Sequence, residues 1–234
     1  MKKLLSLSLA SLAFVAVAAD IQVGVAKITA TSAETIIPVP YATIGSSSNV
    51  SVHDLVKAAN LKDGTMLYYF NGTSYQAWMK SGSAWTTPGV SATQTIAGTS
   101  VIAGSDTVTV AVGAALWVSI PDFGNTESAQ KDIYVYGSPA AASWTIVAGK
   151  SNLLSNPTNS EISDLATKLS TVSAKGDKIL PIGTDFAGYW VKASDGTWSK
   201  VIGTSVEKKA ALPSLGAYKG LWYVSKTGSG KVDL

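Results

Sequence analysis

The sequence predicts a mainly β fold with short helices, built as two similar units. Three observations indicate this class: segments in which apolar and polar residues alternate, an Asn-Gly pair between two such segments, and few stretches with the apolar spacing of a helix. In each unit we expect a short helix packed on an antiparallel β-meander, in a sandwich- or barrel-like arrangement. With 46% hydrophobic and 14% charged residues, the 234-residue chain is apolar enough to bury such cores.

The first nineteen residues have the order of a secretory signal peptide. Lys2 and Lys3 precede an apolar run, residues 4–17, and small residues follow up to Ala19. This order predicts export to the periplasm, the cell surface or the extracellular space, with an uncleaved membrane anchor as the alternative. No later run reaches the roughly 18 apolar residues of a membrane span, so we expect no transmembrane helix in the mature chain.

The mature chain is expected to begin with an alternating strand, residues 20–31, which carries Ile21, Val23 and Val25. This strand and the first unit form the predicted segment 20–141. The second unit is expected at 142–234, after the Pro- and Ala-rich link 137–142.

Two short helices are predicted from apolar residues spaced three and four apart. The first stripe contains Val52, Leu55, Val56 and Ala59, and a second stripe with the same spacing contains Ile162, Leu165, Ala166 and Leu169. Downstream of each stripe, similar residues recur in the same order, which favours an internal duplication. The recurring residues are Gly64 and Gly176, Trp78 and Trp190, Trp85 and Trp198, and Trp117 and Trp222.

Strands are expected on both sides of Asn71-Gly72, at residues 66–70 and 74–79, because Asn-Gly is the strongest short hairpin signal. Further alternating strands are predicted at 107–112, 115–120 and 132–136.

Composition excludes several kinds of chemistry. The absence of Cys excludes disulfides, thiolate catalysis and Cys-based metal sites, and the single imidazole, His53, excludes a multi-histidine site. The lack of Arg and the scattered Lys argue against nucleic acid as a partner. The four Glu fall in predicted loops or at helix starts, where charge is ordinarily solvated: Glu34, Glu127, Glu161 and Glu207. We therefore expect no catalytic residues, no metal and no cofactor.

Aromatic residues are the most informative side chains. The recurring Trp residues are interpreted as core anchors, with a stacking platform for sugar rings as the alternative. The expected structural core is Leu55, Trp78, Trp117, Leu165, Trp190 and Trp222. Four tyrosines do not recur and are the candidates for ligand binding: Tyr68, Tyr69, Tyr75 and Tyr134.

The succession of these motifs resembles a loose family of exported tandem-repeat, β-rich proteins of unknown function from Gram-negative bacteria of the Planctomycetes–Verrucomicrobia type. The residues that carry the resemblance are Asp54-Leu55, Gly64, Leu67, Asn71-Gly72, Tyr75, Trp78, Trp85 and Leu116-Trp117. The resemblance implies export and a tandem β-rich build, and it brings no catalytic residues.

Two functions remain open. One is a non-catalytic exported structural or interaction protein that self-associates through residues 20–31. The alternative is a glycan-binding module that uses exposed Tyr and Trp side chains, with a polysaccharide as its partner.

Overall fold

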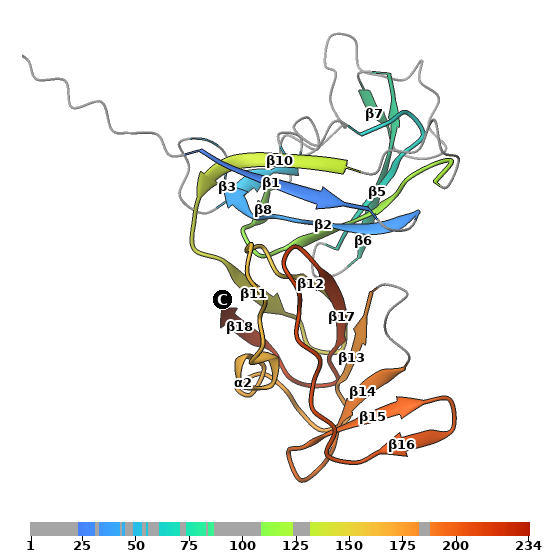
Figure 1. Cartoon of the computed structure of the whole chain (residues 1–234), viewed down its shortest axis with the longest axis vertical. Coiled ribbons are helices and arrows are strands. Elements are labelled where there is room, and N and C mark those ends of the chain that lie inside the picture. Colours follow the sequence, from blue (N-terminus) through green and yellow to red (C-terminus); the bar gives the residue numbers. More distant parts are fainter. Residues whose placement is uncertain are drawn as a thin grey trace, which may run out of the picture.

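The computed structural model describes residues 23–30, 33–42, 44, 49–52, 55, 61–70, 74–82, 84–86, 109–123, 132–182 and 188–234. The expected signal peptide, the Asn71-Gly72 turn, His53 and Glu127 lie outside these residues. Within them the expected mainly β class is confirmed, since the strands form antiparallel sheets (Figure 1).

The first large sheet has the strand order β2-β9-β5-β6-β7. Its strands are β2 (Glu34–Pro38), β5 (Met66–Phe70), β6 (Tyr75–Ser81), β7 (Ala84–Thr86) and β9 (Ala115–Ser119). The predicted hairpin is present as β5 paired with β6, from Met66 opposite Met79 to Phe70 opposite Tyr75.

The second large sheet has the strand order β12-β17-β13-β14-β15-β16. Its strands are β12 (Ser151–Ser155), β13 (Lys178–Pro181), β14 (Tyr189–Lys192), β15 (Trp198–Ile202), β16 (Ser205–Glu207) and β17 (Gly220–Val224). Apart from the added edge strand β16, the two sheets use their strands in the same sequential and spatial order.

Three small sheets accompany the two large ones in the described part of the chain (Figure 1). They are β1 (Gly24–Thr29) with β10 (Asp132–Pro139) and β3 (Tyr41–Ala42), then β4 (Asn49–Ser51) with β8 (Thr109–Ala111), and β11 (Ser143–Ile146) with β18 (Gly230–Asp233). The strand expected near the N-terminus therefore pairs within its own chain. All six residues of β1 face partners on β10, and no other described strand pairs with β1, which therefore lies at the edge of this sheet.

Helix is confined to short segments in the described residues. Helix α2 (Leu165–Lys168) buries Leu165, and Leu169 at its C-cap is fully buried, as the apolar spacing requires. Val52 and Leu55 are likewise helical and buried. No helix among the described residues has the length and apolar character needed to cross a membrane.

The described residues form two main hydrophobic cores. One draws its buried residues from positions 28–135 and contains Leu55 and Trp78, and the other draws them from positions 144–232 and contains Leu165 and Trp190. These four side chains are at most 4% exposed. A third, smaller cluster joins the two large sheets through Ile36, Ala115 and Leu153.

Trp117 and Trp222, which we expected in the core, are less buried than Trp78 and Trp190. Both indoles are only partly buried, and they pack against the small cluster between the sheets instead of either main core. The physical cause is strand alternation, because the neighbours of each Trp point to the opposite face. Leu116, Val118, Leu221 and Tyr223 fill the cores from that face.

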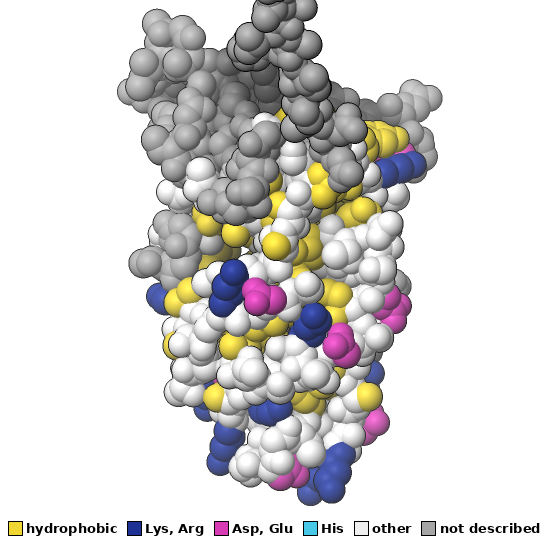
Figure 2. Space-filling view, turned by 90° about the vertical axis from the view of Figure 1, so that its left-hand side faces the viewer, with side chains coloured by type: hydrophobic (Ala, Val, Ile, Leu, Met, Phe, Trp, Pro, Cys, Tyr) yellow, Lys and Arg dark blue, Asp and Glu magenta, His cyan; other side chains and the backbone are white. Residues whose placement is uncertain are grey.

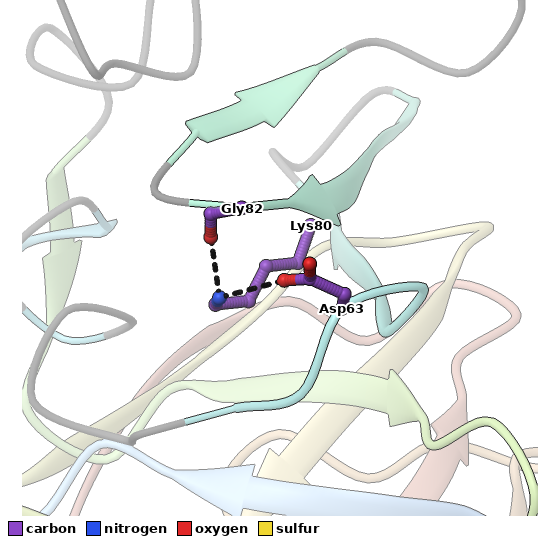
Figure 3. A network of polar contacts seen from close by, with 3 residues as sticks. All are labelled: Asp63, Lys80 and Gly82. Carbon is purple, nitrogen blue, oxygen red and sulfur yellow. Dashed lines mark hydrogen bonds and ion pairs between the residues drawn. The ribbon is translucent and has the colours of Figure 1, made fainter.

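A polar network fixes the segment that enters the first large sheet (Figure 3). The ammonium of Lys80 on β6 lies 3.1 Å from a carboxylate oxygen of Asp63 and donates a 2.6 Å hydrogen bond to the carbonyl of Gly82. This contact joins the turn before β5 to the turn after β6. It serves the fold and lies apart from the groove described next.

Candidate binding groove between the two large sheets

An aromatic groove of about 730 Å³ lies where the outer faces of the two large sheets meet. Strands β2, β5, β6 and β9 contribute one wall, and β12, β13 and β17 contribute the other. The lining residues are Glu34, Tyr68, Tyr75, Trp117, Ser151, Leu180, Trp222 and Val224.

Strand register explains why these side chains converge. Tyr68 on β5 lies directly opposite Trp117 on β9, and residues opposite each other in an antiparallel pair share a face. In the second sheet Leu180 on β13 lies directly opposite Trp222 on β17 in the same way. Each sheet therefore presents one cross-strand pair to the groove.

The rings pack as a tilted cluster. The centroids of Trp117 and Trp222 lie 5.3 Å apart with an interplanar angle of 54°, and Tyr75 meets Trp222 edge-on at 6.0 Å. The two indoles are therefore not coplanar, and their faces line the groove at different inclinations. Tyr75 also contacts Phe70 at a centroid distance of 5.0 Å and is 46% exposed.

Polar contacts hold three of these side chains in place. The indole N–H of Trp117 and the hydroxyl of Ser119 each donate a hydrogen bond to a different carboxylate oxygen of Glu34, the second at 2.8 Å. The phenol of Tyr75 donates a 3.2 Å hydrogen bond across the groove to the carbonyl of Ser151. Burial raises the pKa of Tyr75 to about 12, so its hydroxyl stays protonated at physiological pH.

The four candidate tyrosines lie in different parts of the structure, and two of them line the groove. Tyr68 and Tyr75 line the groove, whereas Tyr69 packs against the first core and borders a smaller cavity of about 260 Å³. Tyr134 lies on β10 in another sheet and is 45% exposed.

Sequence reasoning did not place Glu34 or Ser151 in a site, and it placed Trp117 and Trp222 in one only as the alternative to a core role. The available signal was the alternation Leu116-Trp117-Val118, which shows that the Trp faces away from its two aliphatic neighbours.

Charges elsewhere are mixed in sign. On the coloured part of the face in Figure 2, basic and acidic side chains are interspersed with uncharged and hydrophobic ones.

Within the described ranges, no group of three or more His, Asp or Glu could hold a metal ion. Comparison of the chain with models of protein families, with curated proteins and with solved structures found no match.

Proposed function

We propose that the chain is a non-catalytic, exported interaction protein that binds a glycan in the groove between its two large sheets. The observation that carries this proposal is the convergence of four aromatic rings and one oriented carboxylate, Glu34, from both sheets on a single open groove. Export to the cell surface or extracellular space rests on the order of residues 1–19.

The chemistry of the groove fits a sugar. A pyranose ring has apolar C–H faces and a rim of hydroxyl groups, so it needs aromatic surface together with a few polar partners. Trp117, Trp222 and Tyr68 offer the aromatic surface, and Glu34 offers an acceptor. A volume of about 730 Å³ lies in the range of ordinary ligand sites.

Binding without hydrolysis is the better-supported activity. Most glycoside hydrolases use two carboxyl groups that flank the bond to be broken. The described lining of this groove contains one carboxylate, Glu34, and its two oxygens accept hydrogen bonds from Trp117 and Ser119.

We also infer that the two halves of the chain are a duplicated unit. The shared strand order of the large sheets supports this, as do the matching pairs Tyr68–Trp117 and Leu180–Trp222. In addition, the N–H groups of Gly64 and Gly176 each donate a 2.8 Å hydrogen bond, to the carbonyls of Lys80 and Lys192. On this assignment β1 corresponds to β11, so the first strand belongs to the repeat.

Titration calorimetry on glycans selected from an array tests the binding proposal. We expect Trp222→Ala and Trp117→Ala to weaken binding at least about tenfold, because truncating an aromatic anchor at the centre of a binding surface commonly costs about 2 kcal/mol or more. Tyr136→Ala is the matched control, since Tyr136 is 50% exposed on β10, outside the groove. Unchanged affinity in a folded Trp222→Ala variant would place the ligand elsewhere.

Self-association through β1 is the second candidate function. It is supported by the position of β1 at the edge of its sheet and by the exposed apolar side chains beside that edge. Val23, Val25, Tyr134 and Tyr136 are 45–63% exposed.

A further inference from the structure

The second large sheet contributes its outer face, the face away from its core, to the groove. Leu180 lies on this face and lines the groove, whereas its neighbour Ile179 is fully buried in the core. Trp222 alternates in the same way with the buried residues Leu221 and Tyr223. From the groove the same sheet continues over β14, β15 and β16 towards the lower end of the molecule (Figure 1).

Strand register places a row of side chains across this outer face. Trp222 lies opposite Leu180, Tyr189 lies opposite Val201, and Val201 lies opposite Val206. We call these five residues the outer row. The row crosses β17, β13, β14, β15 and β16, and at the usual spacing of strands it spans roughly 19 Å.

The two halves of the outer row join between β13 and β14. Ile179 on β13 lies opposite Trp190 on β14, and both side chains are buried in the second core. Because side chains alternate along a strand, Leu180 and Tyr189 both lie on the opposite face of these neighbouring strands. The outer row therefore runs from the groove to the edge strand β16 without a break in the sheet.

The outer row has the surface character that a sugar chain needs. It consists of aromatic and aliphatic side chains, and each of them is at least partly exposed, with Val206 58% exposed. Lys178 lies beside the row, with its ammonium 5.3 Å from the ring centroid of Tyr189, and an ammonium can donate hydrogen bonds to sugar hydroxyl groups. Apolar surface with a polar partner thus continues beyond the groove.

The straight course of the outer row favours an extended polymer. Neighbouring strands lie about 4.8 Å apart, which is comparable to the length of one pyranose unit in an extended chain. Linkages of the β-1,4 type between equatorial positions keep successive rings in line, whereas α-1,4 linkages make the chain coil. An extended chain can therefore place successive rings over successive strands, and a coiled chain cannot.

Building on the proposed glycan binding, we propose that the ligand is an extended, β-1,4-linked hexopyranose polymer that fills the groove and continues along the outer row. One segment of the polymer lies against Trp117 and Trp222 in the groove, and the following rings lie over Tyr189 and Val201. Affinity increases with chain length beyond the groove, because each further ring that reaches the outer row removes more apolar surface from water.

Calorimetry with oligomers of two lengths tests this assignment on the mature protein. The probes are the β-1,4-linked dimers and hexamers of glucose, mannose and N-acetylglucosamine, with the α-1,4-linked hexamer of glucose for comparison. We expect at least one β-1,4 hexamer to bind at least about tenfold more tightly than its own dimer, because only the hexamer is long enough to cover the outer row as well as the groove. The same hexamer should exceed the α-1,4 hexamer by a similar factor.

The Tyr189→Ala variant separates the outer row from the groove, because Tyr189 is not part of the groove lining. It should weaken the hexamer at least about fivefold and leave the affinity for the dimer unchanged. Unchanged binding of the dimer also verifies that the variant is folded. Tyr189→Phe keeps the ring and should keep the affinity for the hexamer. Tyr136→Ala is the matched control and should alter neither affinity, since Tyr136 is 50% exposed on β10.

Equal affinity for dimer and hexamer, or an equal effect of Tyr189→Ala on both, would overturn the role of the outer row and leave glycan binding in place. Binding of the α-1,4 hexamer as tightly as the β-1,4 hexamers would overturn the extended polymer as the ligand. The same conclusion holds if glycans of the array bind and none of the β-1,4 hexamers does. Binding of no glycan in the array or the oligomer set would overturn the proposed function itself.

Discussion

The phenol of Tyr223 donates a 2.6 Å hydrogen bond to a carboxylate oxygen of Asp177, and neither side chain is exposed to solvent. The backbone N–H groups of Ala174 and Lys226 donate further bonds to the same carboxylate, at 2.8 and 2.7 Å. Burial, together with the neighbouring Asp177, raises the pKa of Tyr223, so the phenol keeps its proton. A buried carboxylate in the second core thus depends on one side-chain donor and two backbone donors.

Replacing Tyr223 by Phe removes that donor and keeps the ring. We expect Tyr223→Phe to lower the free energy of unfolding by about 1–3 kcal/mol, because a buried acceptor loses a partner without regaining water. Urea unfolding measures the change. Tyr136→Phe is the control and should shift stability by less than about 0.5 kcal/mol, because Tyr136 is 50% exposed. Equal stability of Tyr223→Phe and the wild type would contradict this account.

The recurring Trp residues differ in burial, and this difference predicts how much each Trp→Ala replacement lowers the free energy of unfolding. Trp190 is 4% exposed and its indole N–H donates a 2.9 Å hydrogen bond to the carbonyl of Ala211. Trp190→Ala should cost about 3–5 kcal/mol. Trp222→Ala should cost clearly less, because that indole is partly exposed already. Urea titrations of both variants compare them, and equal losses would mean that Trp222 is a core residue after all.

Gly64 and Gly176 hold equivalent positive backbone angles, with φ of 81° and 86°. A side chain in this left-handed region costs about 1–2 kcal/mol, so Gly64→Ala and Gly176→Ala should destabilise the chain by similar amounts. Gly216→Ala is the control, because Gly216 does not adopt a positive φ and a Cβ there would meet its nearest atom at 3.5 Å. Thermal unfolding of the three variants tests this, and a neutral Gly176→Ala would contradict it.

Local features of the fold were predictable from the sequence because their signals are local. The spacing of Leu165 and Leu169 marks helix α2, and the flanks of Asn71-Gly72 give strands β5 and β6. The groove was not predictable. The groove forms because Ile36 and Leu153 pack together between the two large sheets. The alternation of residues shows that Trp117 lies on the face of its strand away from the core, but it does not show that a second sheet packs against that face.

Acid should weaken the contact between β1 and β10. The hydrogen bond from Lys27 lowers the pKa of the Asp132 carboxyl from its usual range. The folded-state pKa of Asp132 is therefore lower than the unfolded-state value of about 3.9. The ionised carboxyl stabilises the folded chain in full above that unfolded-state value, and this stabilisation is lost as the pH falls through the folded-state pKa. The difference in stability between wild type and Asp132→Asn should therefore shrink between about pH 5 and pH 2, as followed by urea unfolding. A constant difference would show that the ion pair is irrelevant to stability.

Strand β1 lies at the edge of its sheet among the described strands, and its exposed face combines Val25 with Lys27 and Thr29. Lys27 is ion-paired with Asp132 on β10. Val25 is 63% exposed and lies opposite Tyr136, which is 50% exposed. An open edge beside such a face can add a strand from another copy of the chain, and a lysine on an edge strand is a common means of preventing this. Strand β16 of the second large sheet is a useful comparison with β1, because it also lies at a sheet edge and its Val206 is 58% exposed.

If β1 is the contact, the mature protein should form dimers or larger species that sedimentation velocity detects at high protein concentration. Val25→Lys should shift the population to monomer without loss of stability, because the side chain makes its exposed face more polar and leaves the pairing with β10 in place. Val206→Lys adds the same charge to the other edge and should leave the association unchanged. A wild-type protein that stays monomeric would show that β1 serves its own fold alone, and a response to Val206→Lys alone would move the contact to β16.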